Sequence, residues 1–401
     1  MSVHIWFKGE AKFVEPGFST SIMSSFGVPI NQDDFNKKVA AVEIAKRNGQ
    51  WGIFIEDVFH GFDDGHLARR LGEVEPTAQV AFAGHLPFGN YFNCPIQRVH
   101  EDSVLREKLM RETDPKDLKR QKVMLAVSVL IESADGQSAL VTRRSKHMRT
   151  FPHVWVLPGG SFEEDVDADV VQTAIRECQE EVGVTLQPSD LQPFALWESA
   201  FPVQVEVGLP VRHHLVVFFR ARLPRQAGDA EPRLALQAEE VDAAAWVDTE
   251  DLRVALEDVG DLRGRKFAAW EVSPMEGDAS REGGSEPVAS EAKNSEEVKL
   301  VKSKFSLAQL QLHAGRQSEG AGGSSEPDAA PHAGGKGGFS VNSERLSFAT
   351  AFALSTWLDL RARFGKDFSV AHKPVASSMK TGNREGTPEG EVALTGSSSA
   401  L

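Results

Sequence analysis

Apolar and polar residues alternate along the chain in a pattern that predicts strands in its central part. A nearly continuous apolar run at residues 123–131, VMLAVSVLI, is rich in β-branched residues and predicts a buried strand. An Asp-Gly turn at 135–136 and a second apolar run at 138–142 predict that this strand continues into a hairpin. Further strands are expected at 191–199 and 213–220.

Residues 1–120 are expected to form a smaller N-terminal α+β region. Its segment FNKKVAAVEIAKRNG follows Asp33 and Asp34 and ends with basic residues and Gly49, a pattern that predicts an amphipathic helix. WGIFI at residues 51–55 predicts a strand. The aromatic residues near positions 82–92 are expected to lie mainly in the core rather than on a base-stacking surface.

The boundaries of the central domain are predicted by changes of composition. A charged stretch at residues 101–122 predicts an exposed helix and a linker, so the domain is placed at 121–262. Residues 273–345 are dominated by Gly, Ser, Glu, Ala and Pro and are expected to be a disordered linker, interrupted by a short helix at 298–312. An amphipathic helix is predicted at 346–366, and residues 373–401 are expected to be a mobile tail.

An acidic helix ending at Gly183 carries the clearest candidate chemistry. Residues three and four apart are neighbours on a helix, so Glu177, Glu180 and Glu181 lie on adjoining faces of one turn, and Arg176 can pair with Glu180. Crowded carboxylates repel one another unless a cation lies among them, and a hard divalent ion with oxygen ligands meets this need. The opposite face is apolar and should pack inward: Val171, Ile175, Cys178 and Val182.

Composition and charge limit the function classes. With 41% hydrophobic residues the chain of 401 residues can bury a sizeable core, and its net charge of −14 argues against a broad nucleic-acid surface while leaving room for a local basic patch. The two cysteines, Cys94 and Cys178, cannot build a disulfide framework, which fits a reducing compartment. We expect no membrane span and no secretory signal, and therefore a cytoplasmic location, with peroxisome and nucleus left open.

Gly160 and the run RECQEEVGV at residues 176–184 resemble the nudix box, G-x5-E-x7-R-E-U-x-E-E-x-G-U, where U is apolar. The box places its Arg fourteen positions after the Gly, whereas the offset here is sixteen, from Gly160 to Arg176. Ala168 occupies the position where the box has its first Glu, and Asp167 and Asp169 flank it. A two-residue insertion with a displaced acid accounts for this pattern, and either aspartate is a candidate for the missing Glu.

The segments WVLPGG, LWESAFP, GLPVRHHLVVFF and EEVDAAAWV are similar to a vertebrate nudix subfamily, nucleoside diphosphate-linked moiety X motif 17. The similarity covers roughly residues 120–260. It implies an α/β fold in which a nudix α/β/α sandwich with a mixed sheet forms the central domain.

The resemblance implies a metal-dependent hydrolase of a nucleoside diphosphate linked to another moiety. It assigns Mg²⁺ or Mn²⁺ to Glu177, Glu180, Glu181 and the main-chain carbonyl of Gly159. Arg176 would orient a carboxylate, most directly Glu177. The general base is either Glu177 or Glu240, a choice that one sequence leaves open.

Substrate identity is the weaker part of the prediction. The subfamily's description implies a methylated mRNA cap and release of methylated GDP, whereas other nudix enzymes cleave dinucleotides, coenzyme A derivatives or sugar nucleotides. A nudix-like binding module without catalysis is the alternative from another class. The expected partner is a nucleotide-type small molecule or a capped RNA end, with no membrane partner. Candidate substrate-binding residues are Arg143 and Arg144 in a basic cluster, Trp197 and Phe201 as base-stacking or core residues, and His214 on a strand edge.

Overall fold

The computed structural model describes residues 3–9, 12–27, 38–60, 79–91, 94–112, 122–206, 208–224, 233–257, 262, 264–273, 299–311 and 345–370. The described strands are β1 (Val3–Lys8), β2 (Phe13–Val14), β3 (Lys38–Arg47), β4 (Gln50–His60), β5 (Gln79–Asn90), β6 (Met124–Glu132), β7 (Ser138–Arg144), β8 (Trp155–Val156), β9 (Gln192–Phe201), β10 (Arg212–Arg222), β11 (Val241–Asp248), β12 (Lys266–Val272) and β13 (Leu300–Ser306). The described helices are α1 (Ile22–Ser25), α3 (Pro95–Glu101), α4 (Ser103–Glu112), α6 (Val170–Val182), α7 (Thr249–Leu256) and α8 (Phe348–Phe364), with 3₁₀ turns η2 (Pro188–Asp190) and η4 (Leu307–Leu310).

All of these strands belong to one mixed sheet. Its order is β13-β12-β11-β7-β6-β10-β9-β5-β3-β4-β1-β2, and β8 pairs with β7 outside this path. β10 runs parallel to β6 and antiparallel to β9, so the central strands combine both pairing modes. The predicted hairpin of β6 and β7 is present, but the two strands pair only beside their turn, at Glu132 and Ala139.

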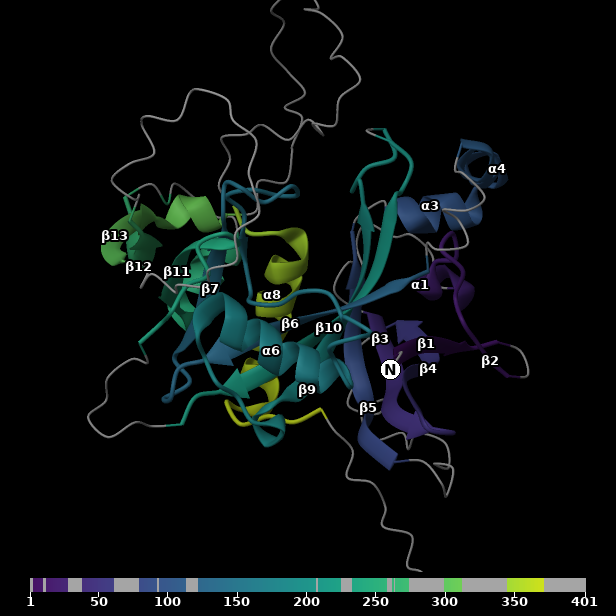
Figure 1. Ribbon diagram of the computed structural model, residues 1–401, viewed down its shortest axis with the longest axis horizontal. Helices are drawn as coiled ribbons and strands as arrows, with labels where there is room; N and C mark the ends of the chain where they lie inside the picture. Colours follow the sequence, from purple (N-terminus) through teal and green to yellow (C-terminus); the bar gives the residue numbers. More distant parts are fainter. Residues whose placement is uncertain are drawn as a thin grey trace, which may run out of the picture.

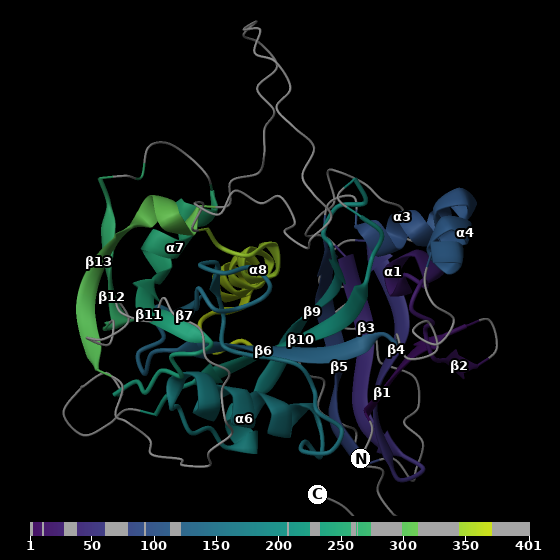
Figure 2. The same ribbon diagram turned by 45° about the horizontal axis from the view of Figure 1, so that its top comes forward.

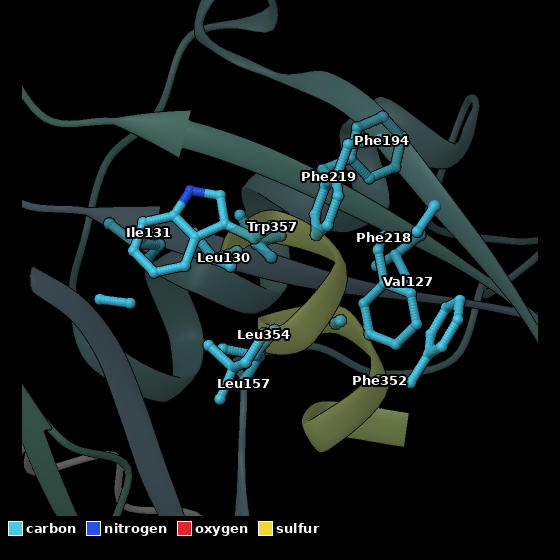
Figure 3. Close-up of a cluster of buried hydrophobic side chains, with 14 of the residues drawn as sticks. Val127, Leu130, Ile131, Leu157, Phe194, Phe218, Phe219, Phe352, Leu354 and Trp357 are labelled. Carbon is cyan, nitrogen blue, oxygen red and sulfur yellow. The ribbon is translucent and has the colours of Figure 1, made fainter. Parts of the chain in front are cut away.

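Two helices cover opposite faces of the central strands. Figure 2 shows α6 on one face of β6 and α8 on the other, which gives the predicted α/β/α layers. On the α8 side, Phe352, Leu354 and Trp357 pack onto a large apolar cluster contributed by β6, β9 and β10 (Figure 3). Such burial is the main favourable term that holds the layers together.

The N-terminal region contains strands and helices, as predicted, but one element has the wrong type. The segment predicted as an amphipathic helix is strand β3, and Asp33 and Asp34 lie outside the described residues. β3 pairs with β4 on one side and β5 on the other, and residues 38–45 are buried. The charge of Glu43 is met within the strand by Arg47, at 3.0 Å, so the charges that resembled a solvated helix face are internal pairs.

The N-terminal strands continue the central sheet rather than forming a separate one (Figure 1). β5 pairs in parallel with β9, through Phe88–Leu196 to Asn90–Glu198. Gly84 and Gly89 in β5 leave room for the chain on the α8 side. A Cβ at Gly84 would lie 2.3 Å from the carbonyl oxygen of Val370, and one at Gly89 would lie 2.7 Å from the Phe352 ring.

The C-terminal predictions are partly wrong. The short helix expected at 298–312 is strand β13 followed by η4, so this part of the expected disordered linker is ordered. β12 and β13 extend the central sheet past the predicted boundary at residue 262. The helix predicted at 346–366 is α8, whereas the tail at 373–401 lies outside the described residues. Among the described helices, none has the length and apolar character required to cross a membrane.

Candidate functional site

The turn at Pro158–Gly160 brings main chain against the middle of β6. The amides of Val129 and Val127 donate to the carbonyls of Pro158 and Gly160, at 2.8 and 2.9 Å. Gly159 has φ +151°, a value that side chains rarely tolerate, and a Cβ there would lie 2.3 Å from the Val127 carbonyl oxygen. Glycine is therefore required for the close approach of this turn to the strand.

The same turn faces the carboxylates of α6. The Gly159 amide donates to Glu181 Oε2 at 3.0 Å. A Cβ at Gly160 would lie 2.4 Å from Glu177 Oε1, so the absence of a side chain makes room for that carboxylate. The two glycines thus place main chain beside two of the three carboxylates that are predicted to bind the metal.

Helix α6 is positioned by its caps and its apolar face. Asp169 is the N-cap and accepts from the amides of Val171 and Gln172, at 2.9 and 3.0 Å. Gly183 ends the helix in the left-handed conformation, φ +71°. The buried apolar side chains of the helix are Val170, Ala174, Cys178 and Val182, so the predicted inward face is correct for Cys178 and Val182, whereas Val171 and Ile175 are only half-buried.

Arg176 connects the acids at the entry and the end of this helix. Its guanidinium binds both carboxylate oxygens of Asp167, each at 2.9 Å, and lies 2.9 Å from Glu177 and 3.0 Å from Glu180. Burial alone would raise the pKa of Asp167, but hydrogen bonds from Arg176 and from the Glu163 amide outweigh it and hold that pKa below its usual value. Asp167 is therefore the acid that faces Arg176 across the inserted residues, while Asp169 serves as the helix cap.

Two buried carboxylates of α6 lack adequate compensation. Glu177 and Glu181 are 7% and 4% exposed. Burial raises the pKa of Glu177 to about 7, against the opposing effect of Arg176, and raises that of Glu181 to about 8, against its bond from Gly159. Glu240 adds further negative charge to both.

Arg144 and Glu240 border the same carboxylates. Burial lowers the pKa of Arg144, and the charges of Glu181 and Glu240 oppose this effect, so the three side chains lie within electrostatic reach of one another. The Glu240 carbonyl also accepts from the Ser145 amide at 2.7 Å, which anchors the start of β11 beside the end of β7. The structure therefore brings Glu240 within electrostatic reach of the α6 carboxylates, so Glu177 and Glu240 both stay candidates for the general base.

The donor types at this site are those that a hard divalent cation prefers. They are carboxylate oxygens beside a glycine main chain, and burial raises the pKa of two of these acids, Glu177 and Glu181. Among the described residues, no three His, Cys, Asp or Glu side chains converge as a metal cage would require. Glu180, with a side chain 51% exposed, points to Arg176.

The predicted substrate residues separate into buried and accessible ones. Arg143 is buried, with Asp242 at 2.6 Å and Glu271 at 2.7 Å, and so belongs to the packing between β11 and β12. Trp197 is fully buried, with ring contacts to Tyr91 and Phe352 at 5.2 and 5.1 Å. Trp197 was predicted to stack on a base or to lie in the core, and the structure places it in the core.

Phe201 and His214 are half-buried, at the end of β9 and near the start of β10. The Phe201 ring meets Phe151 edge to face at 5.6 Å. Burial, together with the neighbouring His213 and Arg212, lowers the pKa of the His214 imidazole to about 4, so His214 is neutral near pH 7. The structure leaves both side chains as candidates for substrate contact.

A buried polar network joining the N-terminal region to the central strands was missed by the sequence reasoning. Glu198, fully buried, accepts from Ser21 Oγ at 2.8 Å and from the Ile22 amide at 2.6 Å. His213 lies 3.2 Å from Glu198 and 2.9 Å from the Phe18 carbonyl, so it belongs to this buried network, unlike its half-buried neighbour His214. The sequence offers one sign of this network, an acid and histidines inside apolar strands. The partner of Glu198, Ser21, is distant in sequence, so the network itself could not be predicted.

Residues 122–270 match the NUDIX domain family. The m7GpppN-mRNA hydrolase NUDT17 of Xenopus laevis is 38% identical over 148 residues, which cover 36% of this chain and 49% of that protein. Its namesake in Danio rerio is 32% identical over 169 residues, covering 42% and 53%. The chain thus spans about half the length of these curated relatives.

Solved structures give a likeness of low overall score. The NUDIX domain of Shewanella oneidensis NrtR, complexed with ADP ribose, has a TM-score of 0.27 and 21% identity, over 37% of this chain and 86% of that one. The MutT protein of Methanosarcina mazei has a TM-score of 0.25 and 24% identity, over 32% and 80%.

The family match spans the glycine turn, α6 and β11, which carry the carboxylates described above. Residues 122–270 therefore match a NUDIX domain, and the chain is similar to the NUDT17 mRNA hydrolases over 148 and 169 residues.

Proposed function

We propose that this protein is a metal-dependent hydrolase that cleaves a nucleoside diphosphate from a larger moiety, with the methylated cap of mRNA as substrate and methylated GDP as product. The observation that carries the proposal is the pair of buried, undercompensated carboxylates, Glu177 and Glu181, against the Gly159–Gly160 turn. A binding module does not need acids that repel one another and raise one another's pKa. The choice of a cap is supported by what the relatives are called.

In this proposal, separate residues bind the metal, position its ligands and accept a proton. Glu177, Glu180, Glu181 and the Gly159 carbonyl hold Mg²⁺ or Mn²⁺, which when bound neutralises phosphate oxygens and lowers the pKa of water. Arg176 holds Glu177 and Glu180 in place from one side, at 2.9 and 3.0 Å. Glu177 or Glu240 accepts the proton of the attacking water, and Arg144 meets a phosphate oxygen.

The half-buried residues at the neighbouring ends of β9 and β10, Phe201 and His214, are proposed to contact the nucleotide. Phe201 provides an aromatic edge for the base, because Trp197 is enclosed in the core. His214, neutral near pH 7, can donate or accept one hydrogen bond there without adding charge. Dinucleotides, coenzyme A derivatives and sugar nucleotides contain the same pyrophosphate group that the site would bind. They are therefore the alternatives to an mRNA cap as substrate.

A substrate panel tests the proposal. Product release from capped RNA and from the competing pyrophosphates is measured with the full chain, with Mg²⁺, with Mn²⁺ and with chelator. We expect metal-dependent release of methylated GDP, and a loss of at least about a hundredfold in Glu180→Gln, because a bound metal ion contributes several kcal/mol. Glu107→Gln, an exposed acid on α4, is the control and should keep full turnover.

Each other outcome has a defined meaning. Faster turnover of a non-capped pyrophosphate would replace the cap as substrate. Full activity of Glu180→Gln, or activity that persists in chelator, would remove the metal assignment. Binding of nucleotides without turnover of any substrate would establish the binding module instead.

A further inference from the structure

The outer strands of the sheet, β12 and β13, carry a basic and aromatic surface. Their register pairs Trp270 with Lys302 and Ala268 with Lys304. The Lys302 ammonium lies 5.4 Å from the centre of the Trp270 ring, in a cation–π contact. We call the side chains that share this face, Lys266, Trp270, Lys302 and Lys304, the basic ribbon.

Cross-strand pairing relates the basic ribbon to the candidate site. Residues opposite one another on neighbouring strands point to the same face of a sheet, as do residues two apart in one strand. Thr142 pairs with Ala244, which pairs with Trp270, so these three share a face. Arg144, two residues after Thr142, is therefore on this face, where it meets the charge of Glu181.

The separation suits one extended ligand. Neighbouring strands lie about 4.8 Å apart, so Trp270 is about 10 Å and Lys302 about 14 Å across the sheet from Thr142. A chain whose first phosphates lie between Arg144 and the α6 carboxylates can reach the basic ribbon with the residues that follow.

The lysines of the basic ribbon form no ion pair with the residues that the structure describes. Lys302 and Lys304 are exposed, and no ion pair or side-chain hydrogen bond to a described residue is formed by either, or by Lys266. The neighbouring acid, Glu271, points to the other face, where it binds Arg143 at 2.7 Å. In a protein of net charge −14, such a patch of unpaired cations is suited to a polyanion.

We propose that the basic ribbon binds the single-stranded RNA that follows a cap held at the NUDIX site, with Trp270 stacking on a base and the lysines meeting phosphates. The chemistry matches how proteins hold single strands without sequence preference, by aromatic stacking along a positively charged path. The choice of RNA rests on the proposed function.

Binding of uncapped RNA isolates this proposal from the proposed function. Fluorescein-labelled single-stranded RNA of about 16 nucleotides is titrated with the full chain in chelator, and fluorescence anisotropy is read over about 50–200 mM salt. The double variant Lys302→Gln/Lys304→Gln should weaken binding about tenfold and lower the slope of log affinity against log salt by about 1.4, for two lost phosphate contacts. Trp270→Ala should lose about tenfold, and Trp270→Phe should recover most of it.

A matched control separates the basic ribbon from general charge. Lys108→Gln/Arg111→Gln removes two exposed cations from α4 and should leave affinity and salt slope as in the parent. In turnover, the basic ribbon variant should lower kcat/KM for a long capped RNA more than for a capped oligonucleotide too short to reach Trp270. The control variant should lower neither.

Several results would overturn the proposal. One is equal loss of affinity in the control and in the basic ribbon variant, and another is unchanged affinity in both. A third is no binding of the parent to uncapped RNA, which would leave the basic ribbon to the chain's own acidic segment at 274–298. That segment carries seven acids, Glu276, Asp278, Glu282, Glu286, Glu291, Glu296 and Glu297, against Arg281 and Lys293. RNA binding through the basic ribbon without any hydrolysis would instead disprove only the proposed function.

Discussion

Two buried acids in this fold, Glu132 and Glu181, have opposite electrostatic surroundings. Glu132, at the end of β6, is fully buried and lies 2.6 Å from Arg222, 3.6 Å from Arg361 and 4.0 Å from Arg220. It also accepts from the Trp357 indole at 2.6 Å. Glu181, 4% exposed, accepts the Gly159 amide but has no ion pair within 4 Å among the described residues.

The contrast shows how a structural acid differs from one that awaits a ligand. Burying a carboxylate is costly unless cations and hydrogen bonds compensate it. Glu132 receives that compensation from the chain itself, and its neighbours hold α8 and the segment after it to the sheet. Glu181 is buried at similar depth without an ion pair of this kind, and burial raises its pKa to about 8, so a bound cation would supply the compensation that Glu132 receives from arginines. We therefore assign Glu132 to stability and Glu181 to function.

The largest expected effect is on the compensated acid. Glu132→Gln would leave three arginines without their shared carboxylate and should lower the free energy of unfolding by about 3–5 kcal/mol. Chemical denaturation monitored by tryptophan fluorescence measures this. Glu250→Gln, which removes an exposed partner of Arg253 at 3.0 Å, is the control and should cost less than about 1 kcal/mol. Equal costs for the two variants would contradict the assignment of Glu132.

The undercompensated acids should give the metal-free protein an unusual pH dependence. The pKa values of Glu177 and Glu181, about 7 and 8, lie above the ordinary value of 4.5, so between pH 4.5 and 8 the folded state holds more protons than the unfolded state. Stability must therefore fall as pH rises through this window, by an amount on the order of a few kcal/mol. Denaturation midpoints in chelator at several pH values measure it.

A variant and a ligand sharpen this test. Glu181→Gln removes one of the two groups and should flatten the fall in stability. Mg²⁺ or Mn²⁺ should restore stability at the alkaline end in the parent and much less in Glu181→Gln. A pH profile identical in parent and variant would show that the charge of Glu181 is compensated after all.

The smallest expected effect distinguishes the two aspartates at the entry of α6. Asp167→Ala would release Arg176 and lower turnover about 10–100-fold, the usual cost of losing a group that orients a metal ligand. Asp169→Ala removes the helix cap and should cost about 1 kcal/mol of stability with nearly full turnover in the folded protein. Equal turnover in both variants would contradict the assignment of Asp167 as a positioning residue and of Asp169 as a helix cap alone.

Helix α6 and the strands around it could be predicted because their signals are local. α6 has its cap, its apolar face and its terminal glycine within one short segment, and the observed helix follows them. β6 is an apolar run, and α8 combines an N-cap at Ser347 with a glycine at its end. Even the inserted residues before Arg176 pointed to two aspartates, of which the structure identifies Asp167 as the partner of Arg176.

The wrong predictions concern segments whose structure depends on partners that are distant in sequence. The charged residues of β3 read as a helix face, because its pairing with β4 and β5 and the Glu43–Arg47 contact are not visible in the segment itself. β13 lies in a stretch of weak apolar pattern and is ordered by pairing with β12. The burial of Trp197 depends on Phe352 in α8, far along the chain.

The pairing of β5 with β9 has a practical consequence for work on this protein. A fragment cut to residues 122–270 would lose β5 and turn β9 into an open edge strand, with unpaired amides and carbonyls along an apolar segment. Open edges of this kind recruit other chains and promote aggregation. The same fragment would also lose Ser21, leaving buried Glu198 without two of its hydrogen-bond donors. We therefore expect the isolated fragment to aggregate, because the N-terminal strands cover the side of β9 that it would expose.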